Sequence, residues 1–278
     1  MQCPGLNSIF SSMELEFPPS YPKPIKTLFY DFKIHPILNC ANISINNLLK
    51  GKIKAFIRPK PIENIKTNTL LFKYPSLKKE LPFKHQRALV IGASNGLGNT
   101  CSKLLSIGGA SVLASFNNTK VLERDSNIHF FQYNALNPTK EMLTTIVNFS
   151  PTHLYYFSTP KIQSIKNPYI QEENLQDFIN HYIFGLNKIL KLNIISLTTI
   201  FCPSTAFIET RPQDFKEYIL AKSLLESFLS FLSQQYICIY PRIEKTLTNQ
   251  TLEITKQNLP TTDEVILKEI LTLKAKNM

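Results

Sequence analysis

The chain is poor in several residue types. Its 278 residues include no tryptophan, eight glycines and five cysteines. The cysteines stand far apart without a CxxC pair, so the sequence predicts neither a disulfide framework nor a metal site. No apolar run approaches the length of a membrane span, and the first residues lack the basic and apolar parts of a signal peptide. We therefore expect a cytoplasmic protein without a membrane partner. The cysteines are Cys3, Cys40, Cys101, Cys202 and Cys238.

Acidic residues are few at the N-terminal end of the chain. The formal net charge is +11, and residues 1–86 hold 13 Lys and Arg against 5 Asp and Glu. Such a balance is compatible with a nucleic acid, an acidic carrier protein or a plain lysine bias. The chain has no Arg-rich run and no aromatic RNA-binding signature, so we expect no nucleic-acid partner. An acidic carrier protein stays open.

Three parts of the chain differ in pattern. Residues 1–60 are β-rich, apart from a short helix expected over Gly5–Met13, and residues 61–86 are interpreted as a linker because they lack a clear period. Residues 87–278 alternate short apolar strands with amphipathic helices, which predicts an α/β domain with a doubly wound parallel sheet. The strands are expected at Ala88–Ile91, Ala110–Phe116, Ile128–Tyr133, Thr152–Phe157, Ile194–Phe201 and Tyr236–Tyr240.

Three of the eight glycines fall within seven residues, at Gly92, Gly96 and Gly98. They lie between the first predicted strand and its helix, where backbone amides and a helix N-terminus can face a pyrophosphate. A turn with a purely structural role is the alternative. The position of the glycines between a strand and a helix favours a Rossmann-like dinucleotide site. The cofactor-binding residues expected in this turn are Gly92, Ser94, Asn95, Gly96, Leu97 and Gly98.

The next strand ends without a carboxylate. An acidic side chain at this point would bind the adenosine ribose hydroxyls and repel a 2′-phosphate. The sequence reads Ser115-Phe116-Asn117 instead, so NADP(H) is favoured over NAD(H). The candidate phosphate partners are Ser115, Asn117, Asn118 and Lys120.

Tyr218 and Lys222 stand four residues apart on a predicted helix, and therefore on one face of it. A neighbouring ammonium favours the phenolate, so the pair predicts a lowered pKa for Tyr218 and a proton donor or acceptor near neutral pH. Alone, the spacing also arises by chance on solvated helices.

Together, the glycine turn and the Tyr218/Lys222 pair resemble the short-chain dehydrogenase/reductase family over about residues 86–250. The resemblance implies that Tyr218 gives a proton to a substrate carbonyl while Lys222 holds the nicotinamide ribose. It also implies that Asn134 and Ala135 lie at the adenine and that Thr246 bonds the nicotinamide amide. A homodimer formed by the helices of Tyr182 and Tyr218 is expected on the same ground.

The chain departs from the family pattern at several points. The family's catalytic serine position holds Thr205, with Ser204 beside it as a substitute. The usual active-site asparagine position holds Tyr182, and the fourth strand ends in the sequence Phe-Ser-Thr-Pro over 157–160. His181 is expected to be a hydrogen-bonded helix residue rather than a catalytic one.

A shorter resemblance concerns the N-terminal segment. Cys3–Ser8 and Ile9–Phe17 are similar to the start of the central helix of hot-dog-fold, MaoC-like acyl dehydratases, and Gly51–Pro59 to a closing strand of that fold. The similarity fits only part of a hot-dog domain. It implies acyl thioester substrates and a carrier protein.

Two functions are compatible with these patterns. The first is an NAD(P)H-dependent carbonyl reductase, with a 3-ketoacyl thioester as one candidate substrate. The second is a non-catalytic dinucleotide-binding or assembly subunit of an acyl-processing system, which the changes at Thr205 and Tyr182 would favour.

Overall fold

The computed structural model describes residues 8–17, 19, 29–46, 49–118, 127–254 and 257–276. The chain forms two compact units. Unit 1 consists of residues 1–62 together with Thr251–Leu259, and unit 2 of Glu63–Gln250 and Pro260–Met278. The chain therefore returns to unit 1 after completing most of unit 2, and each unit is described separately.

Unit 1 is a four-stranded antiparallel sheet in the order β1-β4-β3-β2. The side chain of Asn39, beside strand β3, donates a hydrogen bond of 3.0 Å to the carbonyl of Ile254 and so ties the returning segment to the sheet. The strands are β1 (Ser8–Glu16), β2 (Tyr30–Ile34), β3 (Cys40–Asn46) and β4 (Lys50–Ile57).

The helix expected over Gly5–Met13 is wrong for the described residues, because Ser8–Glu16 is a strand; residues 5–7 lie outside them. Alternating side chains such as Met13, Leu15 and Phe17 fit the period of a strand, and β1 pairs along its length with β4. The part of the hot-dog resemblance that placed helix at Ile9–Phe17 is therefore not confirmed. Cys3 also lies outside the described residues.

Unit 2 contains a six-stranded parallel sheet in the order β11-β9-β8-β5-β6-β7. Counted from its first strand in the chain, this is the 3-2-1-4-5-6 order of a dinucleotide-binding sheet, which confirms the Rossmann-like α/β class. The order reverses between β5 and β8. The strands are β5 (Arg87–Ile91), β6 (Ser111–Phe116), β7 (Ile128–Gln132), β8 (His153–Tyr156), β9 (Thr199–Phe201) and β11 (Ile237–Ile239).

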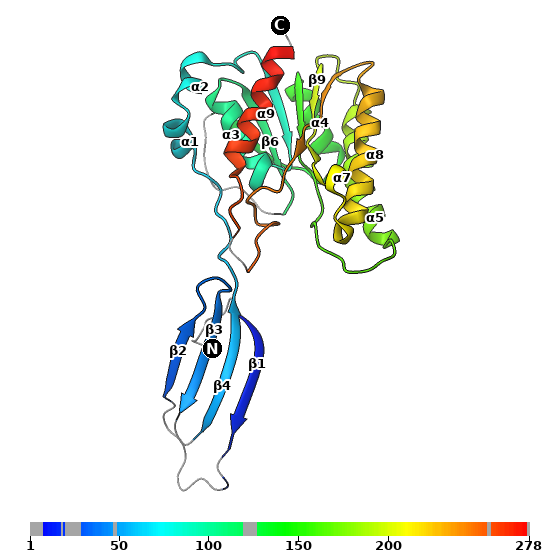
Figure 1. The fold of residues 1–278 in the computed structure, drawn as a ribbon. Coiled ribbons are helices and arrows are strands. Elements are labelled where there is room, and N and C mark those ends of the chain that lie inside the picture. The colour runs from blue at the N-terminus through cyan, green and yellow to red at the C-terminus, as the bar shows by residue number, and fades with distance from the viewer. Residues whose placement is uncertain are drawn as a thin grey trace. The chain divides into compact units, whose positions relative to one another are not determined.

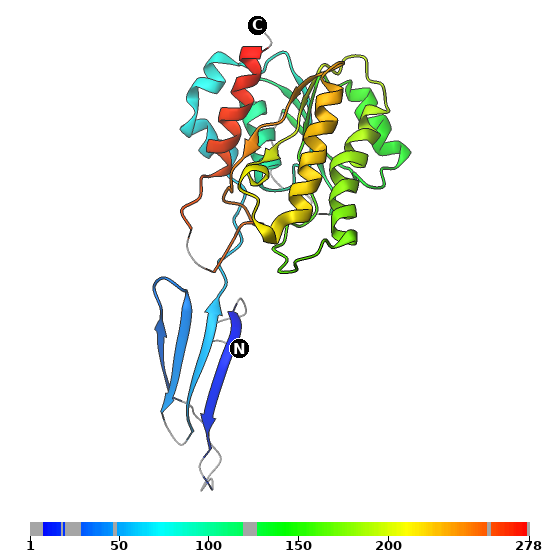
Figure 2. The same cartoon turned by 45° about the vertical axis from the view of Figure 1, so that its right-hand side comes forward.

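Helices cover both faces of this sheet, as Figures 1 and 2 show. Neighbouring strand residues point to opposite faces, so Val90 packs with one group of helices and Leu89 with the other. The first face carries α1 (Thr67–Lys73), α2 (Pro75–Glu80), α3 (Gly96–Ile107) and α9 (Thr262–Lys276). The second carries α4 (Lys140–Phe149), α5 (Glu172–Ile179), the π-helical turn η1 (Asn180–Gly185), α6 (Leu186–Leu190) and α8 (Lys216–Leu232).

Short elements complete unit 2. The strand expected over Ile194–Phe201 covers only Thr199–Phe201, because Asn193 has a φ of 48° and the amide of Leu197 bonds the carbonyl of Ile194 in a turn. The remaining elements are α7 (Phe207–Thr210), the 3-10 turn η2 (Gln213–Phe215) and the paired strands β10 (Ser204–Thr205) and β12 (Arg242–Ile243).

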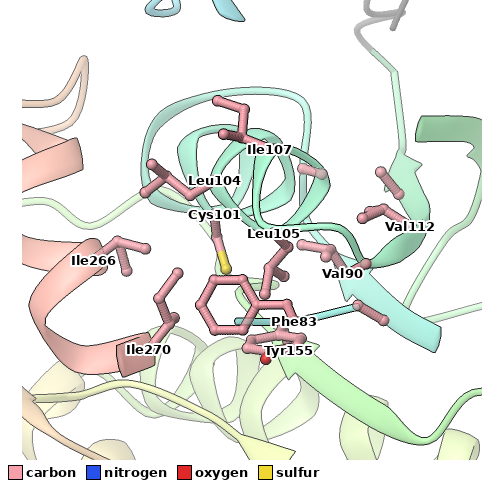
Figure 3. Packing of buried hydrophobic residues seen from close by; sticks show 14 of the residues in the cluster. Phe83, Val90, Cys101, Leu104, Leu105, Ile107, Val112, Tyr155, Ile266 and Ile270 are labelled. Carbon is pink, nitrogen blue, oxygen red and sulfur yellow. The ribbon is translucent and has the colours of Figure 1, made fainter. Parts of the chain in front are cut away.

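Residues 63–86, interpreted from sequence as linker, belong to the core of unit 2. Leu70, Leu77 and Phe83 are buried in the same cluster as the apolar side of α3. Figure 3 shows Phe83 among Cys101, Leu105 and Tyr155. The weak period of this segment reflects two very short helices, each of which buries a single leucine.

Cys40, Cys101 and Cys202 are buried free thiols, and Cys238 is a half-buried one. No helix within the described ranges is long and apolar enough to cross a membrane.

We predict that Phe83→Ala lowers the free energy of unfolding by about 3–5 kcal/mol, because it leaves a cavity against α3. Phe72→Ala is the matched control, since Phe72 is 90% exposed and its loss should change stability by less than about 0.5 kcal/mol. Urea unfolding of both variants measures the difference. Equal values would show that residues 63–86 do not stabilise unit 2.

Candidate active site

Two glycines of the turn at the end of β5, Gly92 and Gly98, have no space for a side chain. Gly92 has a φ of 83°, and its amide donates a 3.0 Å hydrogen bond to Oγ of Ser115. A Cβ atom on Gly98 would lie 2.3 Å from the carbonyl oxygen of Gly92 and 3.3 Å from Cβ of Phe157. The first turn of α3 is thus pressed against the ends of β5 and β8, where the strand order reverses and such folds bind ligands.

The first amides of α3 are not capped by the residue before the helix. Asn95 is extended, and its side chain makes no cap hydrogen bond. The carbonyl of Ser94 accepts a 2.9 Å bond from the Asn64 side chain, which fixes the turn from outside. Gly96 follows with a φ of 61°, and a Cβ there would approach Thr248 at 3.7 Å. Uncapped amides at a helix N-terminus suit a phosphate, so these residues fit the pyrophosphate of a dinucleotide.

The end of β6 offers fewer phosphate partners than the sequence predicts. Ser115 is buried, and its hydroxyl accepts the bond from Gly92, so it supports the turn instead of facing a ligand. Asn117 and Asn118 are exposed, and the carbonyl of Asn117 accepts a bond from Gln132. Lys120 lies outside the described residues. Among the residues described here, which continue after β6 only to Asn118, none is a carboxylate.

Asn134 and Ala135 follow β7. The side-chain oxygen of Asn134 accepts bonds from the amides of Leu136 and Asn137 at 2.9 and 3.1 Å, which closes a local turn. The carbonyl of Ala135 lies 3.4 Å from the place where a Cβ of Gly185 would stand. Thr246 is buried, with its hydroxyl donating to the carbonyl of Glu244 at 2.9 Å.

Lys222 is a buried cation on α8. Its Nζ donates a 2.7 Å hydrogen bond to the carbonyl of Pro203 and lies 4.1 Å from the centre of the Tyr182 ring. Burial lowers the pKa of Lys222 from 10.5 to about 8, because the ammonium loses its hydration. The carbonyl and the ring face partly compensate for this loss.

Tyr218 lies one turn before Lys222, in an aromatic cage. Its ring meets Phe178, Tyr182 and Phe207 edge-on, at centroid distances between 5.6 and 6.4 Å. Burial raises the pKa of Tyr218 from 10.0 to about 12, although a hydrogen bond with Thr205 opposes the shift. The lowered pKa expected from sequence is therefore wrong for this structure. Lys222 Nζ is 5.9 Å from the Tyr218 ring centre and is bonded elsewhere.

Of the two hydroxyls proposed beside Tyr218, only one is close to it. Thr205 hydrogen-bonds Tyr218, whereas Ser204 donates to Oε1 of Glu226 at 2.5 Å. Arg242 binds both carboxylate oxygens of Glu226 at 2.9 and 2.7 Å. Ser204 therefore belongs to a charged cluster behind the site and does not face the reacting position.

Tyr182 occupies the asparagine position with a buried side chain. Its hydroxyl forms a 2.7 Å hydrogen bond with Thr159, which follows β8. The π-helical turn η1 interrupts the helix at this residue, an irregularity common at functional sites. His181 contacts Asp177 one turn earlier in its own helix, as a hydrogen-bonded helix histidine does.

Three groups of the site were missed from sequence. The Pro203 carbonyl and the Thr159 hydroxyl have no motif of their own, because each is brought in by the fold. Glu226 did have a signal, since it follows Lys222 by four residues and so lies on the same helix face.

No protein-family model matches the chain, and no curated protein is significantly similar to it in sequence. Solved structures are similar in fold.

A short chain dehydrogenase from Salmonella enterica serovar Typhi CT18 matches with a TM-score of 0.59 and 15% identity over 70% of this chain and 92% of that one. A short chain dehydrogenase from Burkholderia cenocepacia J2315, in complex with NADP, matches with a TM-score of 0.56 and 14% identity over 69% of this chain and 91% of that one. The short chain dehydrogenase from Shigella flexneri matches with a TM-score of 0.58 and 17% identity over 70% of this chain and 87% of that one. The α/β part of this chain thus has the fold of the short-chain dehydrogenases/reductases.

Proposed function

We propose that the protein is an NAD(P)H-dependent carbonyl reductase or dehydrogenase. The observation that carries this proposal is the position of Tyr218 and Lys222. On α8, Lys222 is buried and Tyr218 is half-buried, in the unit that also holds the glycine turn with uncapped helix amides. If these two positions served packing alone, apolar side chains would fill them better than a phenol and a buried amine. Their presence supports catalysis.

The residues divide the work. Bound NADPH supplies the hydride. Tyr218 is neutral at physiological pH, as an ordinary phenol is, and donates its phenolic proton to the substrate oxygen. Thr205, hydrogen-bonded to Tyr218, orients that oxygen. Lys222 uses one of its donors on Pro203 and keeps others for a ribose hydroxyl. In this proposal Lys222 stabilises the Tyr218 phenolate once the proton has left.

NADP(H) is the preferred cofactor in this proposal. The described residues at the end of β6, up to Asn118, include no carboxylate that would repel a 2′-phosphate, and Asn117 and Asn118 are exposed there. The Burkholderia cenocepacia structure of the same fold contains NADP. Gly92, Ser94, Asn95, Gly96, Leu97 and Gly98 would hold the pyrophosphate.

The proposal extends to the substrate, the partner proteins and the compartment. A 3-ketoacyl thioester is the candidate substrate, and an acidic carrier protein would suit the net charge of +11. One structure of this fold is described as a candidate betaketoacyl-ACP reductase. A homodimer through α8 would cover the exposed Leu220, Leu224 and Phe231. The cytoplasm is the proposed compartment.

The second candidate is a non-catalytic dinucleotide-binding subunit, and one observation favours it. Lys222 is bonded to Pro203 and stacked on Tyr182, and Tyr182 replaces the expected asparagine. If this arrangement persists with nucleotide bound, Tyr218 lacks a cation beside its oxygen. NADPH binding without turnover on any ketone or ketoacyl thioester would support this function.

We expect Tyr218→Phe to lower the reduction of a ketoacyl thioester by NADPH about a hundredfold or more, because it removes the proton donor while keeping the aromatic cage. NADPH affinity, followed by nucleotide fluorescence, should stay within about twofold. Tyr169→Phe, at an exposed tyrosine, is the control and should retain activity. Full activity in Tyr218→Phe would overturn the proposed mechanism.

Gly98→Ala should weaken NADPH binding about tenfold or more, because its Cβ would displace the Gly92 carbonyl and the amides beside it. Gly108→Ala, at the C-terminal end of the same helix, is the matched control. Its Cβ would also overlap a neighbour at 2.3 Å, but that neighbour is the side chain of Phe83. Fluorescence titration should show lost binding only in Gly98→Ala; equal losses would contradict a phosphate site at the turn.

Without nucleotide, Lys222→Met should stabilise the protein by about 1–2 kcal/mol at pH 7. In the native protein the ammonium is buried, and its pKa is lowered from 10.5 to about 8. Burying the Lys222 ammonium therefore lowers the free energy of unfolding most below pH 8. The loss becomes smaller as the pH rises and vanishes above about pH 10.5. The advantage of Lys222→Met, measured by urea unfolding from pH 7 to 10, should shrink with rising pH. A variant less stable than wild type at pH 7 would show that Lys222 is well solvated.

A further inference from the structure

The two faces of the unit 1 sheet differ in chemistry along most of their length. Apart from the end pair Ser8 and Ile57, the register places one set of side chains from all four strands on a common face, and every member of this set is apolar or glycine. We call it the apolar face. It consists of Phe10, Met13 and Leu15 on β1, Tyr30, Phe32 and Ile34 on β2, Ala41, Ile43 and Ile45 on β3, and Gly51, Ile53 and Ala55 on β4.

The opposite face is polar along most of its length. Lys50 and Lys52 on β4 stand across from Glu16 and Glu14 on β1, and Lys33 on β2 stands across from Asn42 on β3. The lysines are exposed. A sheet with one solvated face and one wholly apolar face is half of a two-layer structure.

The described residues of unit 1 provide no second layer. They contain the four strands, the connection between β2 and β3 and the returning residues 251–254 and 257–259, but no helix. Phe10, Met13, Tyr30, Phe32 and Ile34 are between 39% and 59% exposed. Side chains of this kind carry about 150–250 Å² each when large, so these five leave on the order of 500 Å² of apolar surface uncovered. This is at the upper end for a monomer, and patches of that size commonly mark an interface.

We propose that a second copy of this chain covers the apolar face, so that two unit 1 sheets pack face to face as a sandwich. Two faces of about 500 Å² bury about 1,000 Å² together, which reaches the size a specific interface needs. The face carries no charge, so an identical face opposes it without an unpaired ion. The polar faces would then both remain in water.

The shape of the face is compatible with this packing. The inner strands carry Ala41, Gly51 and Ala55, whereas the edge strands carry the large side chains. Two twisted sheets pack with their strands either about 30° apart or nearly perpendicular. Ala41 and Ala55 are already buried within one copy, so the exposed side chains of the edge strands would make the contact between the two sheets. This interface is separate from the α8 surface considered above.

Because the chain has no tryptophan, Phe32→Trp introduces a single fluorescent reporter into the apolar face. Its emission should move to shorter wavelength as the full-length protein is concentrated about a hundredfold, because the second copy removes the indole from water. Phe72→Trp, at a 90% exposed position on α1, is the matched control. A Phe32→Trp emission that is independent of concentration and remains that of a water-exposed indole would overturn the proposal.

A second pair of variants tests the same face by mass. Met13→Lys combined with Phe32→Lys places two charges on exposed edge positions and should lower the weight-average mass about twofold in sedimentation. Met13→Leu with Phe32→Leu should keep the wild-type mass, and Phe72→Lys, at an exposed position on α1, controls for the added charge. An unchanged mass in the folded lysine variant, or a wild type that is monomeric at every concentration, would refute the second copy as the occupant.

Discussion

Unit 2 depends on one close contact, between the end of strand β5 and the first turn of helix α3. Gly92 and Gly98 leave the Gly92 carbonyl no room for a neighbouring side chain, and Phe157 at the end of β8 closes the same point. The contact brings helix amides to the place where the strand order reverses. It also sets the angle of α3, whose apolar side then packs on Phe83, Tyr155 and α9 (Figure 3).

The second face of the sheet is organised around a buried charge. The Lys222 ammonium is compensated by the Pro203 carbonyl and the Tyr182 ring, and not by a carboxylate in direct contact. Tyr182 is held by Thr159, and the helix takes a π-helical turn at this residue. The aromatic cage around Tyr218 follows from the same packing. Burial, more than neighbouring charge, therefore sets the direction of the pKa shifts of Tyr218 and Lys222.

Much of unit 2 could be predicted from sequence because its signals are local. The alternation of apolar strands and helices, the glycine spacing and the four-residue step from Tyr218 to Lys222 each lie within one segment. The two short helices within residues 63–86 were not predicted. Their leucines can be recognised as core residues only when α3, which shares their hydrophobic cluster, is in place. The pKa of Tyr218 also could not be predicted. It depends on Phe178 and Phe207, which other parts of the chain bring to the ring.

The return of residues 251–259 to unit 1 gives the chain an unusual connectivity. The two units are interleaved along the chain. Residues 251–259 return to unit 1, where the carbonyl of Ile254 accepts a hydrogen bond from the Asn39 side chain, and residues 260–278 then complete unit 2. Cutting the chain after residue 62 would therefore not separate the two units cleanly. Unit 1 would lose a piece, and unit 2 would keep a segment whose partner had gone. A clean separation would need cuts at three positions, after residues 62, 250 and 259, and the two resulting parts of each unit would have to be rejoined.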